Sequence, residues 1–213
     1  MNGTLEANRG ENPFNDWSIL HMPYVTGDFH VGDNMVDFVL EDGTRLSMAY
    51  NGYNNVSAAL EWLAATGISP DKLLVAGQSA GGFAAEANVM RGALRHILGK
   101  YGDRVTVLHS ETISDNVLAW FEARLNGEEP GPEHRAGWTQ RMLATYGSLN
   151  RDYPNFYLYL TDYGRTEDGK TTHTLSLADS YYDTNEDGVS LATWLADAVI
   201  RGAPYDVGLG WLD

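Results

Sequence analysis

Residues 73–83 read Leu-Leu-Val-Ala-Gly-Gln-Ser-Ala-Gly-Gly-Phe, and this stretch decides the fold that the chain is expected to adopt. The apolar run at 73–76 is typical of a buried strand, and a segment of helical composition, Ala84 to Leu98, follows the glycines. Gly77 and Gly81 flank Ser79 and carry no Cβ that could collide at a tight corner. The stretch therefore predicts a serine displayed at the apex of a strand-to-helix turn.

A helix that begins directly after Ser79 would point its first amide groups, including that of Ala80, at the space above the serine. Negative charge that develops in this space would meet oriented N–H donors. These features predict the nucleophile elbow of an α/β-hydrolase. The alternative is a glycine-rich turn whose serine only caps the helix.

The composition limits the class of protein. A chain of 213 residues that is 43% hydrophobic can bury one core, so we expect a single α/β-hydrolase-like catalytic domain over 1–213, with a polar lead-in arm at 1–16. A formal net charge of −15 repels polyanions, which argues against nucleic acid or an anionic membrane as a partner. With no cysteine in the chain, we expect no disulfide and no thiolate metal site. No glycine-rich phosphate loop and no zinc-ligand spacing occurs either, so we expect no metal and no cofactor, and the oligomeric state stays open.

The N-terminus is polar and resembles no signal peptide, and no run of 18 apolar residues predicts a membrane span. As written, the chain is expected to be cytoplasmic, or secreted if a leader has been removed.

Strands and helices are expected to alternate around the elbow. The predicted strands are 17–22, 73–76, 104–108 and 155–160, together with a hairpin of Met35–Leu40 and Arg45–Tyr50 around Asp42-Gly43. The predicted helices are one that Asn54 or Asn55 caps and Gly67 ends, the elbow helix, and 117–125, 138–149 and 189–200. This order predicts an α/β fold with a mostly parallel sheet flanked by helices.

A nucleophilic serine requires a base and an acid, which in α/β-hydrolases follow it in the order serine, acid, histidine. His173 lies after a late strand and is the predicted base, with His109 as a weaker competitor. Asp115, just beyond a predicted strand, is the predicted acid, and Asp162 is the alternative. His134 and His96 are expected at the surface, His134 in a loop rich in proline and glycine.

Two further segments suggest functional roles. The loop after the first predicted strand suits the carboxyl edge of the sheet, so Thr26, Asp28 and His30, with Gln78, are expected to line the pocket; the alternative is that they only brace the loop. Asp183 to Gly188 has the spacing of a calcium loop, but Trp194 stands where that loop needs a carboxylate. We expect an acidic turn, with a partial calcium site as the alternative.

Several motifs together resemble the pectin acetylesterases, a family that includes the Notum-type carboxylesterases. They are Asn12-Pro13-Phe14-Asn15-Asp16-Trp17, the segment 23–32, Gly52-Tyr53-Asn54-Asn55, Gly77-Gln78-Ser79-Ala80-Gly81-Gly82, His173-Thr174-Leu175 and the segment 188–195. The resemblance implies a serine esterase with Ser79 as nucleophile and His173 as base, and favours Asp115 as acid. It also implies an O-acetylated polysaccharide such as pectin as the substrate.

The chain departs from the family pattern in two places. Family members usually carry early strands and a Gly-Gly-Gly-x-x-Trp-like loop that completes the oxyanion hole, and nothing before Asn12 supplies one. A strand and a cap segment after the elbow helix are also absent. We therefore expect an abbreviated member in which Gly27, or a partner subunit, offers the second amide. The alternatives are a short-chain esterase for non-sugar esters and a non-catalytic binding domain.

Overall fold

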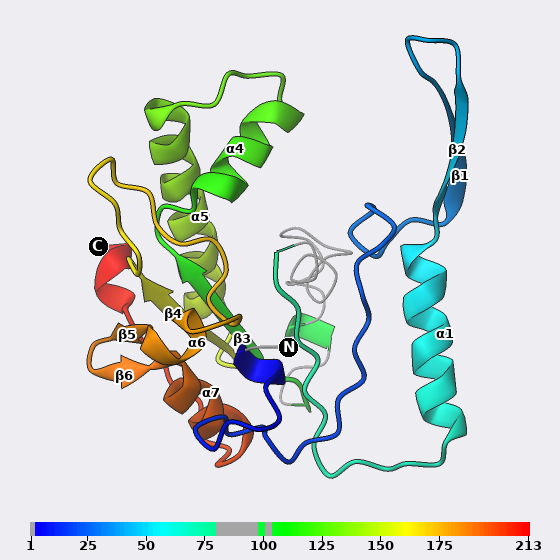
Figure 1. The fold of residues 1–213 in the computed structure, drawn as a ribbon. Coiled ribbons are helices and arrows are strands. Elements are labelled where there is room, and N and C mark those ends of the chain that lie inside the picture. Colours follow the sequence, from blue (N-terminus) through cyan, green and yellow to red (C-terminus); the bar gives the residue numbers. More distant parts are fainter. Residues whose placement is uncertain (1–2, 80–97, 101–103) are drawn as a thin grey trace. The chain divides into compact units, whose positions relative to one another are not determined.

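The computed structural model describes residues 3–79, 98–100 and 104–213 of the chain (Figure 1). Contacts between Cα atoms divide the chain into a smaller unit, Ile19–Leu94, and a larger unit formed by Met1–Ser18 and Arg95–Asp213. The single catalytic domain over 1–213 stays a prediction. Ala80 and the predicted elbow helix up to residue 97 lie outside the described residues.

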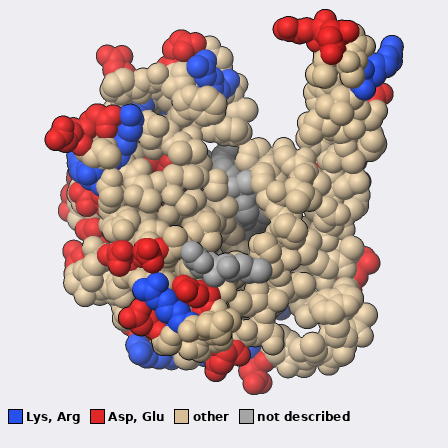
Figure 2. Space-filling model, in the orientation of Figure 1, with Lys and Arg blue, Asp and Glu red and all other residues tan. Residues whose placement is uncertain are grey.

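The smaller unit contains the predicted hairpin. Strands β1 (Asn34–Val39) and β2 (Arg45–Tyr50) pair antiparallel, with Asn34 opposite Tyr50 and Val39 opposite Arg45. At the turn, Asp42 accepts a hydrogen bond from the Thr44 amide, and Gly43 adopts φ +83°. On the face that Figure 2 shows, charged side chains gather at this tip. The Asp-Gly signal is thus confirmed.

Helix α1 (Gly52–Ala65) follows the hairpin and ends as predicted, with Gly67 in the left-handed conformation after the last turn. The prediction that Asn54 or Asn55 caps its start is wrong. The helix begins at Gly52, and the cap position is Asn51, whose side chain makes no capping hydrogen bond. The carboxylate of Asp28 accepts the Gly52 amide at 2.7 Å instead, so a residue distant in sequence takes over the capping role.

Two predicted strands do not form. Residues 17–22 and 73–76 pair with no other strand of the described ranges, although Leu73 and Val75 have the expected apolar composition. These two side chains are 66% and 67% exposed. A strand exists only where a neighbour satisfies its backbone groups, so apolar composition alone does not create one. The described residues form three two-stranded sheets rather than one mostly parallel sheet.

The larger unit is built on a parallel pair of strands, β3 (Val107–Thr112) and β4 (Phe156–Thr161), aligned from Val107 opposite Phe156 to Thr112 opposite Thr161. Strand β3 thus begins three residues later than the predicted start at Arg104 and ends four residues later than the predicted end at Leu108. Helices α4 (Asn116–Leu125) and α5 (Pro132–Asp152) form the connection between the two strands (Figure 1). Mixed helices and small sheets with one parallel pair are compatible with an α/β fold.

Helix α5 begins six residues before the predicted start at Trp138, so the predicted loop over 126–137 is shorter than expected. Pro132 occupies the first position of the helix, where proline lacks only an amide that would be unpaired anyway. The Pro/Gly-rich composition therefore marks a helix start rather than a long surface loop.

The core of the larger unit surrounds β4, whose Leu158, Tyr159 and Leu160 are fully buried. The ring of Tyr159 lies 5.4 Å from that of Trp194, whose indole N–H donates to the Tyr205 carbonyl at 2.6 Å. Trp194 belongs to α7 (Leu191–Val199), which confirms the predicted C-terminal helix. The remaining elements are η1 (Gly3–Leu5), α6 (Ser180–Asp183), β5 (Asn185–Glu186), β6 (Val189–Ser190) and η3 (Leu209–Leu212).

The acidic segment at 183–188 forms the turn of the β5–β6 hairpin. Asp187 and Gly188 both have positive φ, +52° and +81°, as a two-residue hairpin turn requires. The carboxylate of Asp187 accepts the Gly208 amide, and that of Glu186 accepts the Trp211 indole N–H. These carboxylates therefore have partners within the protein.

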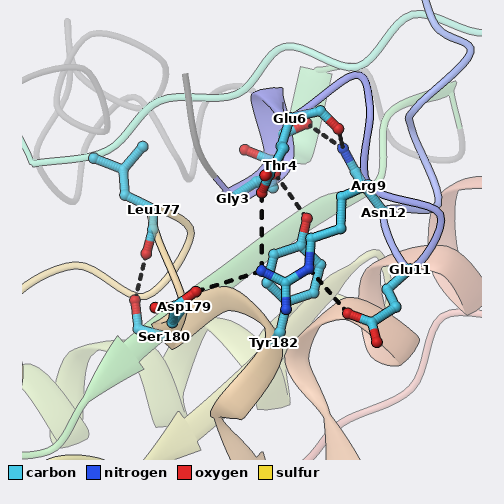
Figure 3. Close-up of polar contacts among 10 residues, drawn as sticks. All are labelled: Gly3, Thr4, Glu6, Arg9, Glu11, Asn12, Leu177, Asp179, Ser180 and Tyr182. Atoms are coloured by element: carbon cyan, nitrogen blue, oxygen red, sulfur yellow. Dashed lines mark hydrogen bonds and ion pairs between the residues drawn. The ribbon is translucent and has the colours of Figure 1, made fainter.

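The polar segment predicted as a lead-in arm packs against α6 (Figure 3). Asn12 is 1% exposed, and its amide donates to the carbonyls of Thr4 and Glu6. The guanidinium of Arg9 lies 3.6 Å from the ring centroid of Tyr182, whose hydroxyl donates to Gly3. The described part of this segment is thus an integral part of the larger unit.

Among the helices of the described ranges, none combines the length and apolarity that crossing a membrane requires.

Candidate active site

The structure brings together the predicted acid and base. Nδ1 of His173 lies 2.5 Å from Oδ2 of Asp115, although 58 residues separate them in sequence. The Asp115 side chain is 1% exposed and that of His173 is 22% exposed. A carboxylate at Nδ1 orients the ring and favours the tautomer that carries its proton on Nδ1. The residues predicted as acid and base are therefore in direct contact.

Asp115 serves two structural purposes at once. Its second oxygen, Oδ1, accepts the amides of Val117 and Leu118 at 2.8 and 3.0 Å, which makes Asp115 the N-cap of α4. Because the same carboxylate caps a helix and contacts His173, its position and orientation are fixed from two sides.

A cluster of three threonines, Thr112, Thr171 and Thr172, holds the loop that carries His173 against the end of β3 through hydrogen bonds. The Thr171 hydroxyl donates to the Thr112 hydroxyl at 2.8 Å and accepts the Ser114 amide at 3.1 Å. The Thr112 hydroxyl in turn donates to the Thr172 carbonyl at 2.9 Å. Residues 171 and 115 also form a parallel bridge. Sequence reasoning missed this cluster, and its only signal is that each threonine lies within three residues of the predicted acid or base.

The environment of His173 favours its protonated form. The hydrogen bond with Asp115 raises the pKa of His173 above its ordinary value of 6.5, burial opposes this effect, and the charges of Asp115 and Glu111 reinforce it. An imidazolium at this position is therefore stabilised.

Asp162, the alternative acid, and His109, the competing histidine, lie in environments that differ from that of the Asp115–His173 pair. Asp162 forms an ion pair with Arg165 at 3.6 Å, with 40% of its side chain exposed. His109 is buried against Tyr146, with ring centroids 3.8 Å apart.

The prediction that His134 lies in a surface loop is wrong, because α5 begins at Pro132 and includes it. The His134 side chain is 11% exposed and contacts Glu128 and Glu122 at 2.8 and 3.3 Å. His96 lies outside the described residues.

Ser79 belongs to the smaller unit and is exposed, with φ at +51°. The left-handed region is unusual for a residue other than glycine, asparagine or aspartate and costs about 1–3 kcal/mol. Such strain is what the elbow pattern predicts at its serine. Both polar atoms of the neighbouring Gln78 amide are buried with no hydrogen-bond partner among the described residues. The approach of Ser79 to His173 stays a prediction, as does the oxyanion role of Ala80 and Gly27.

Asp28 organises the loop that the sequence predicts as a pocket lining. Its carboxylate accepts the Thr26 hydroxyl at 2.5 Å, the His30 amide at 3.0 Å and the Gly52 amide. Burial tends to raise the pKa of Asp28, but these hydrogen bonds outweigh it and the pKa lies below its ordinary value. A Cβ at Gly32 or Gly52 would collide with this carboxylate. These contacts brace the loop, and the pocket role of Thr26, Asp28, His30 and Gln78 stays a prediction.

The comparisons with known proteins give one match. The family model described as pectinacetylesterase matches residues 1–110, just over half of the 213 residues. The matched range contains the Asp28 loop and the segment around Ser79, whereas Asp115 and His173 lie beyond it. Searches of curated proteins and of solved structures found no significant match. The chain therefore belongs to the pectinacetylesterase family.

Proposed function

We propose that this protein is a serine carboxylesterase that removes O-acetyl groups from a polysaccharide such as pectin. Membership of the pectinacetylesterase family suggests a carbohydrate esterase function. The observation that supports the proposal most strongly is the 2.5 Å contact between His173 and Asp115, because a buried carboxylate on Nδ1 is the arrangement that prepares a histidine to act as a base.

In the proposed reaction, Ser79 Oγ attacks the acetyl carbonyl carbon while His173 Nε2 takes the hydroxyl proton. Asp115 stabilises the resulting imidazolium, and the amides of Ala80 and Gly27 bind the oxyanion. The tetrahedral intermediate then expels the sugar alkoxide, which receives the proton from His173, and leaves an acetyl group on Ser79. Water activated by His173 hydrolyses this acyl-enzyme and releases acetate.

The substrate class is tested by comparing three esters. The purified protein is incubated with acetylated pectin, acetylated xylan and p-nitrophenyl acetate, and the released acetate or nitrophenol is measured. We expect the highest kcat/KM on acetylated pectin. Equal rates on all three would instead indicate a short-chain esterase, and no release above the Ser79→Ala background would indicate a non-catalytic binding domain.

The raised pKa of His173 predicts the pH dependence of the reaction. His173 must be neutral to accept the serine proton, so kcat/KM should rise with pH through a midpoint above 6.5. The stability that the charged pair contributes has the opposite dependence: it is present below about pH 6.5 and is lost as the pH rises through the raised pKa. The measurement is kcat/KM, with the melting temperature, between pH 5 and 9.

Asp162→Asn is the control for this profile, because Asp162 is not among the groups that shift His173. The control should keep the wild-type midpoint. A wild-type midpoint below 6.5 would contradict the assignment of His173 as the base.

A further inference from the structure

Two buried hydroxyls lie between the segment that carries Asp115 and the segment that carries His173. They belong to Thr112, at the end of β3, and to Thr171, two residues before His173. Thr112 is fully buried, and Thr171 is 7% exposed. Because a buried hydroxyl without a hydrogen bond costs free energy, each of them needs partners inside the protein.

The two hydroxyls form one continuous chain of hydrogen bonds. The Ser114 amide donates to Thr171 Oγ1 at 3.1 Å, and that hydroxyl donates to Thr112 Oγ1 at 2.8 Å. The Thr112 hydroxyl then donates to the Thr172 carbonyl at 2.9 Å. Since an amide N–H can only donate and a carbonyl can only accept, the two ends fix the direction of both hydroxyls. Neither hydroxyl can turn to another partner without breaking the chain, and hydrogen bonds in series strengthen one another.

The ends of this hydroxyl chain are the neighbours of the proposed acid and base. Ser114 directly precedes Asp115, and Thr172 directly precedes His173. The backbone N–H of Thr171 also donates to the Ser114 carbonyl at 3.1 Å, which joins the two segments at one point. The bond to Thr172 adds a second point, one residue closer to His173. Two points of attachment fix the orientation of the loop as well as its position.

Thr172 is held by the preceding turn in addition. Its amide donates to the Tyr163 carbonyl at 3.1 Å, and a Cβ at Gly164 would collide with its hydroxyl. Gly164 adopts φ +70°, a conformation that favours glycine, so the turn is built for this close approach. The loop that carries His173 therefore has one packed position, and in that position the hydroxyl chain is complete.

We propose that Thr171 and Thr112 are positioning residues that hold His173 and Asp115 at hydrogen-bond distance through this chain. The assignment rests on the proposed function, in which the pair serves as the base and acid of the esterase. Neither hydroxyl has a chemical role in the proposed reaction, so each acts only through the imidazole. Loss of the chain should slow the proton-transfer steps and leave substrate binding unchanged.

Replacing Thr171 with valine tests the positioning role, because valine keeps the branched shape and removes the hydroxyl. On acetylated pectin, kcat should fall by about 10–100-fold with KM unchanged, since a displaced base affects the chemical step rather than binding. Thr112→Val breaks the chain at its other hydroxyl and should lose as much. Thr171→Ser keeps the hydroxyl and should retain most of the wild-type kcat.

Thr184→Val is the matched control. Thr184 is also fully buried, and its hydroxyl donates to the Ser180 carbonyl at 2.6 Å in α6. The substitution removes a buried hydroxyl bond of the same kind, so it should lower the stability measured by urea unfolding but leave kcat unchanged. Circular dichroism verifies that each variant is folded, and Thr112→Val carries the test if Thr171→Val does not fold.

NMR titration of the His173 ring gives a readout that needs no ester. The hydrogen bond with Asp115 raises the pKa of His173, burial opposes this, and the charges of Asp115 and Glu111 add to it. A looser contact should lower the measured pKa toward 6.5 in Thr171→Val, whereas Thr171→Ser and Thr184→Val should keep the wild-type value. A wild-type pKa in folded Thr171→Val, or an equal loss of kcat in Thr184→Val, would overturn the positioning role. If no variant and no wild-type protein releases acetate but the pKa still falls in Thr171→Val, the positioning role stands and the proposed function fails.

Discussion

Replacing Ser79 with alanine is expected to lower the rate of acetate release from acetylated pectin by about 10⁴-fold or more, to near the uncatalysed background. The proposed mechanism has no second nucleophile, and His173 cannot form the acyl-enzyme by activating a methyl group. The family match covers the segment around Ser79, and the positive φ of this residue is the strain expected at a nucleophile elbow. The measurement is acetate release under saturating substrate.

Ser148→Ala is the control for this substitution. Ser148 lies on α5, where its hydroxyl donates to the Thr145 carbonyl, so its loss should leave the rate unchanged. Labelling of the wild-type protein with a fluorophosphonate, followed by peptide mapping, should modify Ser79 and no other serine. Full activity in Ser79→Ala, or a label on a different residue, would show that Ser79 is not the nucleophile.

The parts of the fold that could be predicted from the sequence are those with a local signal. Asp42-Gly43 determined the hairpin, Gly67 the end of α1, and the apolar pattern after Asp115 the helix α4. In each case the residues that form the structure are neighbours along the chain, so turn chemistry and periodicity suffice.

The parts that could not be predicted depend on distant partners. Leu73 to Ala76 has strand composition but no paired strand in the described ranges, and the start of β3 is set by its register against β4. The N-terminus of α1 is set by Asp28, which no local rule connects to Gly52. These contacts form only when segments far apart in sequence meet.

The candidate site was partly predictable for a different reason. The position of Asp115 between Ser79 and His173, just after a predicted strand, and the family resemblance together favour Asp115 over Asp162, and the structure places Asp115 in contact with His173. The order says nothing about how the pair is supported, so the hydrogen bonds of Thr112 and Thr171 could be found only in the structure.

Replacing Asp115 with asparagine is expected to lower kcat by about 10⁴-fold, because an amide next to Nδ1 favours the wrong tautomer of His173 and does not stabilise the imidazolium. The N-cap should survive, since asparagine caps helices about as well as aspartate. Asp115→Ala should lose as much activity and also destabilise the protein by roughly 0.5–2 kcal/mol through loss of the cap. Activity and urea unfolding of both variants are measured at pH 8.

Comparing Asp115→Asn with Asp115→Ala separates the proposed catalytic role of the Asp115 carboxylate from its role as the N-cap of α4. If Asp115 is the acid, Asp115→Asn fails in catalysis but unfolds closer to the wild type than Asp115→Ala does, while Asp162→Asn keeps both activity and stability. If instead Asp115 only caps α4, the Asp115→Asn variant should retain nearly full activity. The 2.5 Å contact between Asp115 and His173 would then be structural. Retained activity in Asp115→Asn together with its loss in Asp162→Asn would transfer the acid role to Asp162. The electrostatic and structural effects are separable here because Oδ1 serves the helix and Oδ2 serves the imidazole.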